Sequence, residues 1–253
     1  MVHKPRQLLA GHLRFDRPGR GDLSPAAVHE RALNRRHRAS PAFAALDVGC
    51  GAGDLTLALA RRGAQVVASD VSNEMTRMTR DRIDAAALNE AVIRADAHHL
   101  PFASGAFHLV VALGLLPWAR SMPSVMAELA RVTRMGGWVL VSFDNSFRLF
   151  RWLDPKLTPV AQPLRRKVGT ILGRKGGGNR LVSPRAARAT VESAGLQVLR
   201  TTSVGFGPPT FLARPVGPES VALRIDAALS RLAETRDPWL SRLGSHYIVL
   251  ARR

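Results

Sequence analysis

The chain contains the stretch Leu46-Asp47-Val48-Gly49-Cys50-Gly51-Ala52-Gly53, in which glycines occupy alternate positions from 49 onward. The apolar run over 43–48 predicts a short buried strand, and the pattern over 54–62 predicts a helix. Glycines between a strand and a helix leave the backbone open to close approach by a ligand. The stretch therefore predicts a ligand-binding loop at the end of a strand.

The alternation of strand and helix continues beyond this loop. Further strands are predicted over 65–69, 91–95, 107–113, 138–143, 196–204 and 245–251. Further helices are predicted over 72–86, 121–133 and 183–194. Strands that alternate with helices at this spacing predict βαβ units and a parallel sheet, so the fold class is α/β.

Three segments lie outside this regular pattern. Residues 1–40 are basic and predict an N-terminal cap with a helix over 24–38. The rest of the chain, 41–253, is expected to be one domain with insertions at about 144–182 and 205–243. The second insertion predicts an amphipathic helix, whose apolar face comprises Val221, Ile225, Ala228, Leu229 and Leu232.

The glycine spacing distinguishes two nucleotide ligands. The order G-x-G-x-G differs from the G-x-G-x-x-G of dinucleotide-binding loops, and Asp54 stands at the start of the helix. A pyrophosphate needs that helix end for its own negative charge, so a carboxylate there would repel it. S-adenosylmethionine (SAM) has no phosphate and carries a sulfonium cation. The loop therefore favours SAM over a dinucleotide.

Two further acids follow the next strands. Asp70 ends the second strand, where a carboxylate can accept hydrogen bonds from both ribose hydroxyls. Asp96, followed by Ala97, comes after the third strand and could place a carboxylate near the adenine amino group. The alternative for each acid is a solvated strand end or a helix cap. The register of Asp70 with Asp47 and the glycines favours the cofactor site.

The centre of the chain resembles the class I SAM-dependent methyltransferases, nearest the type-11 group that includes quinone-biosynthesis methylases. Besides the glycine loop, the matching residues are Val67-Ala68-Ser69-Asp70-Val71-Ser72, Asp96-Ala97, Leu100-Pro101-Phe102, Phe107-His108-Leu109-Val110, Glu128-Leu129-Ala130-Arg131-Val132 and Gly136-Gly137. The resemblance implies a Rossmann-like seven-stranded sheet of order 3-2-1-4-5-7-6, with strand 7 antiparallel and helices on both faces.

The resemblance also implies a cofactor site. Asp47 and the glycines would hold the methionine moiety, and Asp70 would hold the ribose. Asp96 and Ala97 would flank the adenine, on which Met75 would pack unless it is a core residue of its helix. The candidate cofactor-binding residues are Asp47, Gly49, Gly51, Gly53, Asp70, Val71, Met75, Asp96, Ala97 and Leu113.

No catalytic residue is assigned from the sequence. After the fourth strand the chain has the apolar segment Leu113-Gly114-Leu115-Leu116-Pro117-Trp118, where the family usually has polar or aromatic residues. In-line methyl transfer depends mainly on alignment and needs a base only if the acceptor holds a proton. The candidates near the expected mouth, each more typical of a structural or solvated role, are His98, His99, Asp144 and His246.

Several methyltransferase chemistries are disfavoured by what the sequence lacks. The single cysteine, Cys50, lies in the glycine loop, which argues against a cysteine nucleophile. The segment Leu116-Pro117-Trp118 does not match the Asn-Pro-Pro-Tyr motif of amino methylases. Asp144-Asn145 resembles two ligands of a Mg²⁺ site, but no acid ends the fourth strand. We therefore expect no metal.

The charge of the chain suggests an anionic partner. Lys and Arg number 37 against 19 acids, and 145–191 holds 11 Lys or Arg with one acid, Asp154. Apolar side chains are interleaved there: Phe147, Leu149, Phe150, Trp152 and Leu153. Three roles are compatible with this segment: a lid with a solvated basic face, a surface that binds anionic lipid, or a surface that binds RNA. Only 6% of residues are aromatic, which places RNA last.

The outer segments bear on the acceptor. Phe143-Asp144-Asn145, Leu153-Asp154-Pro155, 204–208 and 246–251 resemble bacterial type-11 methylases of glycan and natural-product pathways. That implies methylation, on oxygen, of a small-molecule or saccharide acceptor, and the basic segment adds a lipid-linked acceptor. The alternatives are an RNA methyltransferase and a SAM-binding module without activity. Without a secretory signal or a membrane-spanning run, a cytoplasmic protein is expected, peripheral to the inner membrane face if the basic segment binds lipid.

Overall fold

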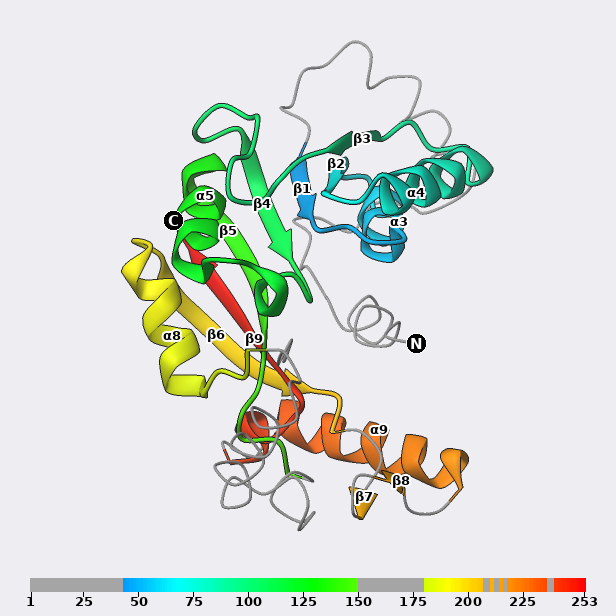
Figure 1. The fold of residues 1–253 in the computed structure, drawn as a ribbon, viewed down its shortest axis with the longest axis vertical. Helices are drawn as coiled ribbons and strands as arrows, with labels where there is room; N and C mark the ends of the chain where they lie inside the picture. Colours follow the sequence, from blue (N-terminus) through cyan, green and yellow to red (C-terminus); the bar gives the residue numbers. More distant parts are fainter. Residues whose placement is uncertain (1–42, 150–179, 207–209, 212–213, 216–217, 236–238) are drawn as a thin grey trace, which may run out of the picture.

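A seven-stranded sheet forms the centre of the molecule in the computed structural model, which describes residues 43–149, 180–206, 210–211, 214–215, 218–235 and 239–253. Its strands are β1 (Ala44–Val48), β2 (Gln65–Asp70), β3 (Ala91–Arg94), β4 (Phe107–Ala112), β5 (Thr133–Asp144), β6 (Gln197–Val204) and β9 (His246–Arg252). The strand order is β3-β2-β1-β4-β5-β9-β6, and β9 is antiparallel to both of its neighbours (Figure 1). The predicted order and the antiparallel last strand are confirmed.

Helices lie between the strands. They are α3 (Asp54–Ala60), α4 (Asn73–Ala85), α5 (Met122–Val132), α8 (Pro184–Ser193) and α9 (Glu219–Thr235), with short 3-10 turns η1 (Leu116–Trp118) and η3 (Leu240–Arg242). Three of these helices begin after a serine whose hydroxyl accepts a backbone N–H of the first turn. These caps are Ser72, Ser121 and Ser183. A two-stranded pair, β7 (Thr210–Phe211) and β8 (Arg214–Pro215), stands apart from the main sheet.

Two apolar clusters cover the two faces of the sheet. Successive side chains of a strand point to opposite faces. Leu46 and Val48 of β1 therefore pack in the cluster that contains α5 and α8, whereas Ala45 packs in the cluster that contains Leu55 and Leu59 of α3. In Figure 1, α4 lies beside α3, away from α5 and α8. The expected helices on both faces are confirmed.

Strand β5 begins earlier than the sequence predicts. It starts at Thr133, directly after α5, and runs through Gly136 and Gly137 instead of beginning at 138. A Cβ on Gly137 would stand 2.9 Å from the carbonyl oxygens of both Arg134 and His108. The backbones at the start of β5 and β4 thus approach too closely for any side chain at 137.

The predicted outer segments are described only in part. The N-terminal cap over 1–40 and residues 150–179 lie outside the described residues. The predicted helix of the second insertion is present as α9, but its apolar face is not uniformly covered, because Val221 is 47% and Leu232 51% exposed. Among the described helices, none has the length and apolar character needed to cross a membrane.

A clamp between Glu128 and Arg131 holds the loop after β3 against α5. The Glu128 carboxylate accepts the backbone N–H of Leu100 at 2.8 Å and pairs with Arg131 at 2.7 Å. Arg131 also donates to the carbonyl oxygens of Phe102 and Leu100. Hydrogen bonding from Arg131 lowers the pKa of Glu128 below its ordinary value. The Glu-Leu-Ala-Arg motif of the sequence thus fixes this loop, which carries part of the site.

Replacing Glu128 with glutamine is expected to lower the free energy of unfolding by about 1–2 kcal/mol at pH 7, because the charged hydrogen bonds are lost. A lowered carboxyl pKa contributes stability above the unfolded pKa, here near 4.5, and that stability disappears as the pH falls through the folded pKa. Urea unfolding at pH 7 and at about pH 3 measures the difference, which should be smaller at the lower pH. The exposed Glu192, paired with Arg188, is the matched control and should show little effect.

Candidate cofactor and active site

The glycine loop has a backbone that only glycine adopts without strain. Gly49, Gly51 and Gly53 have φ values of 67°, 55° and 83°. A Cβ on Gly49 would lie 3.1 Å from Leu115 Cδ1, and one on Gly53 would lie 2.8 Å from Thr79 Cγ2. The loop is therefore packed closely against the segment after β4 and against α4.

Asp47 lies beneath this loop. Its side chain is buried, and its Oδ2 accepts the hydroxyl of Thr56, which belongs to α3, at 2.7 Å. Asp47 stands on the same face of β1 as Ala45, so the carboxylate lies under the helix and not at the ligand side. From this place Asp47 can support the loop.

Exchanging Thr56 for valine should lower the free energy of unfolding by about 1–3 kcal/mol, because a buried carboxylate loses a donor without a change of shape. The free energy is measured by urea denaturation. Thr190→Val is the control, since that half-exposed hydroxyl donates only to a carbonyl of its own helix and its loss should cost under about 0.5 kcal/mol. Equal effects of the two changes would contradict the role assigned to Thr56.

Asp70 joins the end of β2 to the glycine loop. Its Oδ2 accepts the N–H of Gly51 at 2.9 Å, and its Oδ1 accepts the N–H of Ser72 at 3.0 Å. A carboxylate oxygen has more than one lone pair, so each oxygen can accept a second donor. Asp70 can therefore hold the loop and accept ribose hydroxyls at the same time.

Asp54, which the sequence places at the helix start, has a cationic partner on the neighbouring helix. Arg82 of α4 lies 2.7 Å from Asp54 Oδ1 and donates to the carbonyl of Ala52 at 2.7 Å. The Asp54 side chain thus occupies the amino end of α3, which is where a pyrophosphate would bind.

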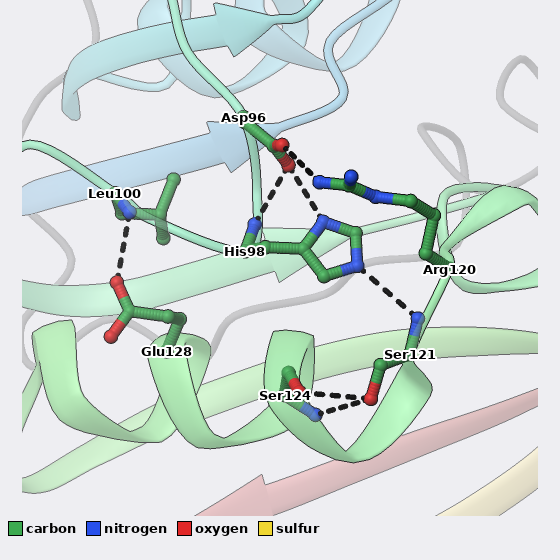
Figure 2. Close-up of polar contacts among 7 residues, drawn as sticks. All are labelled: Asp96, His98, Leu100, Arg120, Ser121, Ser124 and Glu128. Atoms are coloured by element: carbon green, nitrogen blue, oxygen red, sulfur yellow. Dashed lines mark hydrogen bonds and ion pairs between the residues drawn. The ribbon is translucent and has the colours of Figure 1, made fainter.

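Asp96 takes part in a polar cluster at the rim of the site (Figure 2). Its Oδ1 lies 2.7 Å from His98 Nδ1, and its Oδ2 accepts from Arg120 at 3.0 Å. His98 Nε2 accepts the N–H of Ser121 at 3.2 Å, so the ring carries its proton on Nδ1. Hydrogen bonds from the backbone and then the ring of His98 lower the pKa of Asp96, which stays ionised.

These features surround one cavity of about 740 Å³ at the carboxyl ends of the parallel strands. Such edges are the usual ligand sites of open α/β sheets. Of the ten predicted cofactor residues, Asp47 and Gly53 do not line the cavity, because Asp47 lies beneath the loop and Gly53 is packed against Thr79. The eight that do line it are Gly49, Gly51, Asp70, Val71, Met75, Asp96, Ala97 and Leu113.

The cavity continues past the predicted residues to a second wall. Leu115, Pro117 and Trp118 form its apolar side, and Trp118 is 68% exposed. Ser142 and Asp144 of β5 and His246 of β9 form its polar side. Ser142 was not predicted as a site residue, although it stands two residues before Asp144 and therefore on the same face of β5. Of the four candidates near the mouth, His98, Asp144 and His246 line the cavity and His99 does not.

The charge of the cavity fits SAM. Four carboxylates line the cavity, from Asp54, Asp70, Asp96 and Asp144, against the single guanidinium of Arg120 among the described lining residues. Negative charge of this kind favours a cationic ligand over a phosphate. A Cβ on Gly114 would meet nothing within 4 Å, so the backbone there is open to the ligand. The sheet order, the glycine loop and the acid after β2 together define a class I SAM-dependent methyltransferase.

Comparisons with known proteins agree with this class. The model of a methyltransferase domain family, type 11, matches residues 46–141. "Methyltransferase GfsG" of Streptomyces halstedii is 32% identical over 211 residues, which cover 80% of this chain and 68% of that protein. The UbiE C-methyltransferase of Ralstonia nicotianae is 32% identical over 142 residues, covering 49% of this chain and 58% of UbiE. The chain belongs to the type-11 group of class I SAM-dependent methyltransferases, and SAM is its cofactor.

Solved structures share the fold. The [4+2]-cyclase SpnF superposes with a TM-score of 0.54 at 20% identity, covering 94% of this chain and 85% of SpnF. A possible histamine N-methyltransferase of Thermotoga maritima gives a TM-score of 0.52 at 14% identity, covering 90% and 88% of the two chains. At these identities the likeness establishes the architecture alone.

The expectation of no metal stays a prediction. Within the described ranges, no group of three or more His, Cys, Asp and Glu side chains is placed to hold a metal ion. Asp144 of the suggested Mg²⁺ pair faces His246 instead, with Nδ1 and Oδ1 3.2 Å apart. The amide of its neighbour Asn145 donates to the carbonyls of Arg242 and Gly244.

Proposed function

We propose that this protein transfers the methyl group of SAM to an oxygen atom of a small organic acceptor, which is free, lipid-linked or part of a saccharide. The proposal rests on the second wall of the cavity. Its apolar side, Leu115, Pro117 and Trp118, suits the carbon skeleton of an acceptor, and its polar side, Ser142, Asp144 and His246, suits a hydroxyl group. When bound, SAM supplies a methyl group on an electrophilic sulfonium.

The size of the cavity supports a small acceptor. About 740 Å³ lies within the range of small-molecule sites and is shared between cofactor and acceptor. Arg180, which belongs to the basic segment 145–191, donates to the carbonyl of Arg120 at the cavity rim, at 3.0 Å, so part of that segment reaches the cavity. Lipid or RNA contacts by that stretch, and a cytoplasmic location, stay predictions.

A second candidate is transfer to carbon. The UbiE relatives carry the name of ubiquinone/menaquinone biosynthesis C-methyltransferases and match about half of this chain at 31–33% identity. A quinol-type ring would suit the apolar wall beside Trp118, so the acceptor atom needs a direct test.

The test is a transfer assay with methyl-labelled SAM and cell extract separated into small-molecule, lipid and RNA fractions. Label is expected in the small-molecule or lipid fraction, and ¹³C spectra of the product distinguish O-, N- and C-methyl groups. Label confined to RNA, or a methyl group on carbon, would contradict the proposal. A chain that binds SAM and labels none of the fractions would be a binding module.

A further inference from the structure

Two Asp–His pairs line the cavity, and they differ in what their second ring nitrogen does. In the first pair, both nitrogens of His98 are used, Nδ1 by Asp96 and Nε2 by the backbone N–H of Ser121 (Figure 2). This ring joins the loop after β3 to the amino end of α5. His98 is therefore a structural histidine, although it lies in the cavity.

The second pair is built by strand pairing at the far wall. Asp144 is the last residue of β5 and His246 the first of β9, and the two stand directly opposite each other in the antiparallel ladder. Nδ1 of His246 lies 3.2 Å from Oδ1 of Asp144, whose side chain is 10% exposed against 25% for His246. Among the described residues, none forms a hydrogen bond with Nε2 of His246. His246 itself lines the cavity.

Both members of the pair are held in place. The backbone carbonyl of Asp144 accepts the N–H of Val182 at 2.8 Å. A Cβ on Gly205 would lie 3.5 Å from Cδ2 of His246, so the backbone there supports one edge of the ring. In the sheet, β5 is one strand beyond β4 and β9 is two strands beyond it. Because neighbouring strands lie about 4.8 Å apart, the pair lies past the cofactor half of the cavity.

We propose that His246 is the general base of the transfer and that Asp144 positions its ring. The proposal rests on the proposed function, because it requires an acceptor that loses a proton. A carboxylate near Nδ1 favours the tautomer in which Nε2 is free to accept, which is the arrangement of a base oriented by a third group. Distances at the edge of hydrogen-bond reach are usual before the acceptor binds.

In the transfer step, the acceptor hydroxyl gives its proton to Nε2 of His246 while the new oxygen–carbon bond forms. The sulfur–carbon bond breaks, and its electron pair stays on sulfur. One positive charge is thus lost at sulfur and one appears on the imidazole, where Asp144 faces it.

The charged groups around His246 set the expected pH dependence. Asp144 faces the ring from β5, and β6 presents the uncharged Val204 opposite it. Across the cavity, the described titratable groups are Asp54, Asp70, Asp96, His98 and Arg120. If His246 is the base, the pH profile of the transfer rate should change when the ring is removed.

The kinetic test compares His246→Asn with His99→Asn, a matched exposed histidine outside the cavity. With labelled SAM and the small-molecule fraction of extract, His246→Asn should lower kcat about 10²–10³-fold. The affinity for S-adenosylhomocysteine, measured by calorimetry, should change less than twofold. His99→Asn should leave both unchanged. Equal rates for wild type and His246→Asn would overturn the assignment of His246 as general base, whatever atom is methylated.

The spectroscopic test needs no acceptor. Long-range ¹H–¹⁵N correlation of the full chain with S-adenosylhomocysteine, assigned with His246→Asn, should show His246 protonated on Nδ1 and bare on Nε2 at pH 8. Asp144→Asn should abolish this preference, which a purely structural aspartate would not do. A proton on Nε2 in the wild type would overturn the inference. A C- or N-methylated product with the kinetic loss intact would overturn only the choice of oxygen.

Discussion

Replacing Asp70 with alanine is expected to weaken binding of SAM and of S-adenosylhomocysteine by about 1–3 kcal/mol, roughly five- to 150-fold. Two causes act together. The ribose hydroxyls lose their acceptor, and the N–H groups of Gly51 and Ser72 lose theirs. Because the ribose is common to both ligands, both affinities should fall by the same factor in calorimetric titrations.

Charge alone would give a different pattern. Removal of a carboxylate weakens the binding of a sulfonium cation more than the binding of the neutral thioether of the product. If Asp70 acted through its charge alone, its loss would therefore lower the affinity for SAM more than the affinity for S-adenosylhomocysteine. Asp81→Ala, on the exposed side of α4, makes the same change in net charge and should leave both affinities within about twofold. A loss restricted to SAM, or an equal loss in Asp81→Ala, would contradict the ribose contact.

Replacing Gly53 with alanine should lower the free energy of unfolding by about 2–5 kcal/mol. A left-handed alanine costs about 1–2 kcal/mol, and overlap with a packed neighbour adds about 1–3 kcal/mol. The neighbour is Thr79, whose Cγ2 would lie 2.8 Å from the new Cβ. Thr79 cannot move away freely, because it is buried and its hydroxyl donates to the carbonyl of Gly51 at 2.7 Å.

Gly195→Ala separates the two contributions. Gly195 has a similar φ of +78°, but nothing lies within 4 Å of its Cβ position, so only the backbone cost applies. Urea unfolding should therefore show a smaller loss than for Gly53→Ala. Thr79→Ser removes the nearest atom and should recover part of the loss in the double variant. Identical losses for the two glycines would mean that the loop is not packed against Thr79.

The cofactor half of the site was predictable because its residues are local in sequence. Each lies just after a strand, and the spacing of the glycines and Asp70 carries the information. Asp47 was predicted to hold the methionine moiety, but it does not line the cavity. The alternation of Ala45, Leu46 and Asp47 shows afterwards that Asp47 shares a face with the residues under α3.

The acceptor half could not be predicted in the same way. Asp144 and His246 are about 100 residues apart in sequence and meet only through the pairing of β5 with β9. From the sequence alone, His98 and His246 were equal candidates for a catalytic role. The difference between them is whether a backbone N–H, here that of Ser121, occupies Nε2, and that depends on where α5 begins. The early start of β5 likewise depends on contact between strands at Gly137.

We expect one cavity, formed by the glycine loop, Asp70 and the acids around them, to hold SAM. The test is calorimetric titration of the full chain with SAM, S-adenosylhomocysteine and NAD. SAM and S-adenosylhomocysteine should each bind at one site per chain, and NAD should not bind. Binding of NAD, or no binding of either SAM or S-adenosylhomocysteine, would contradict this expectation.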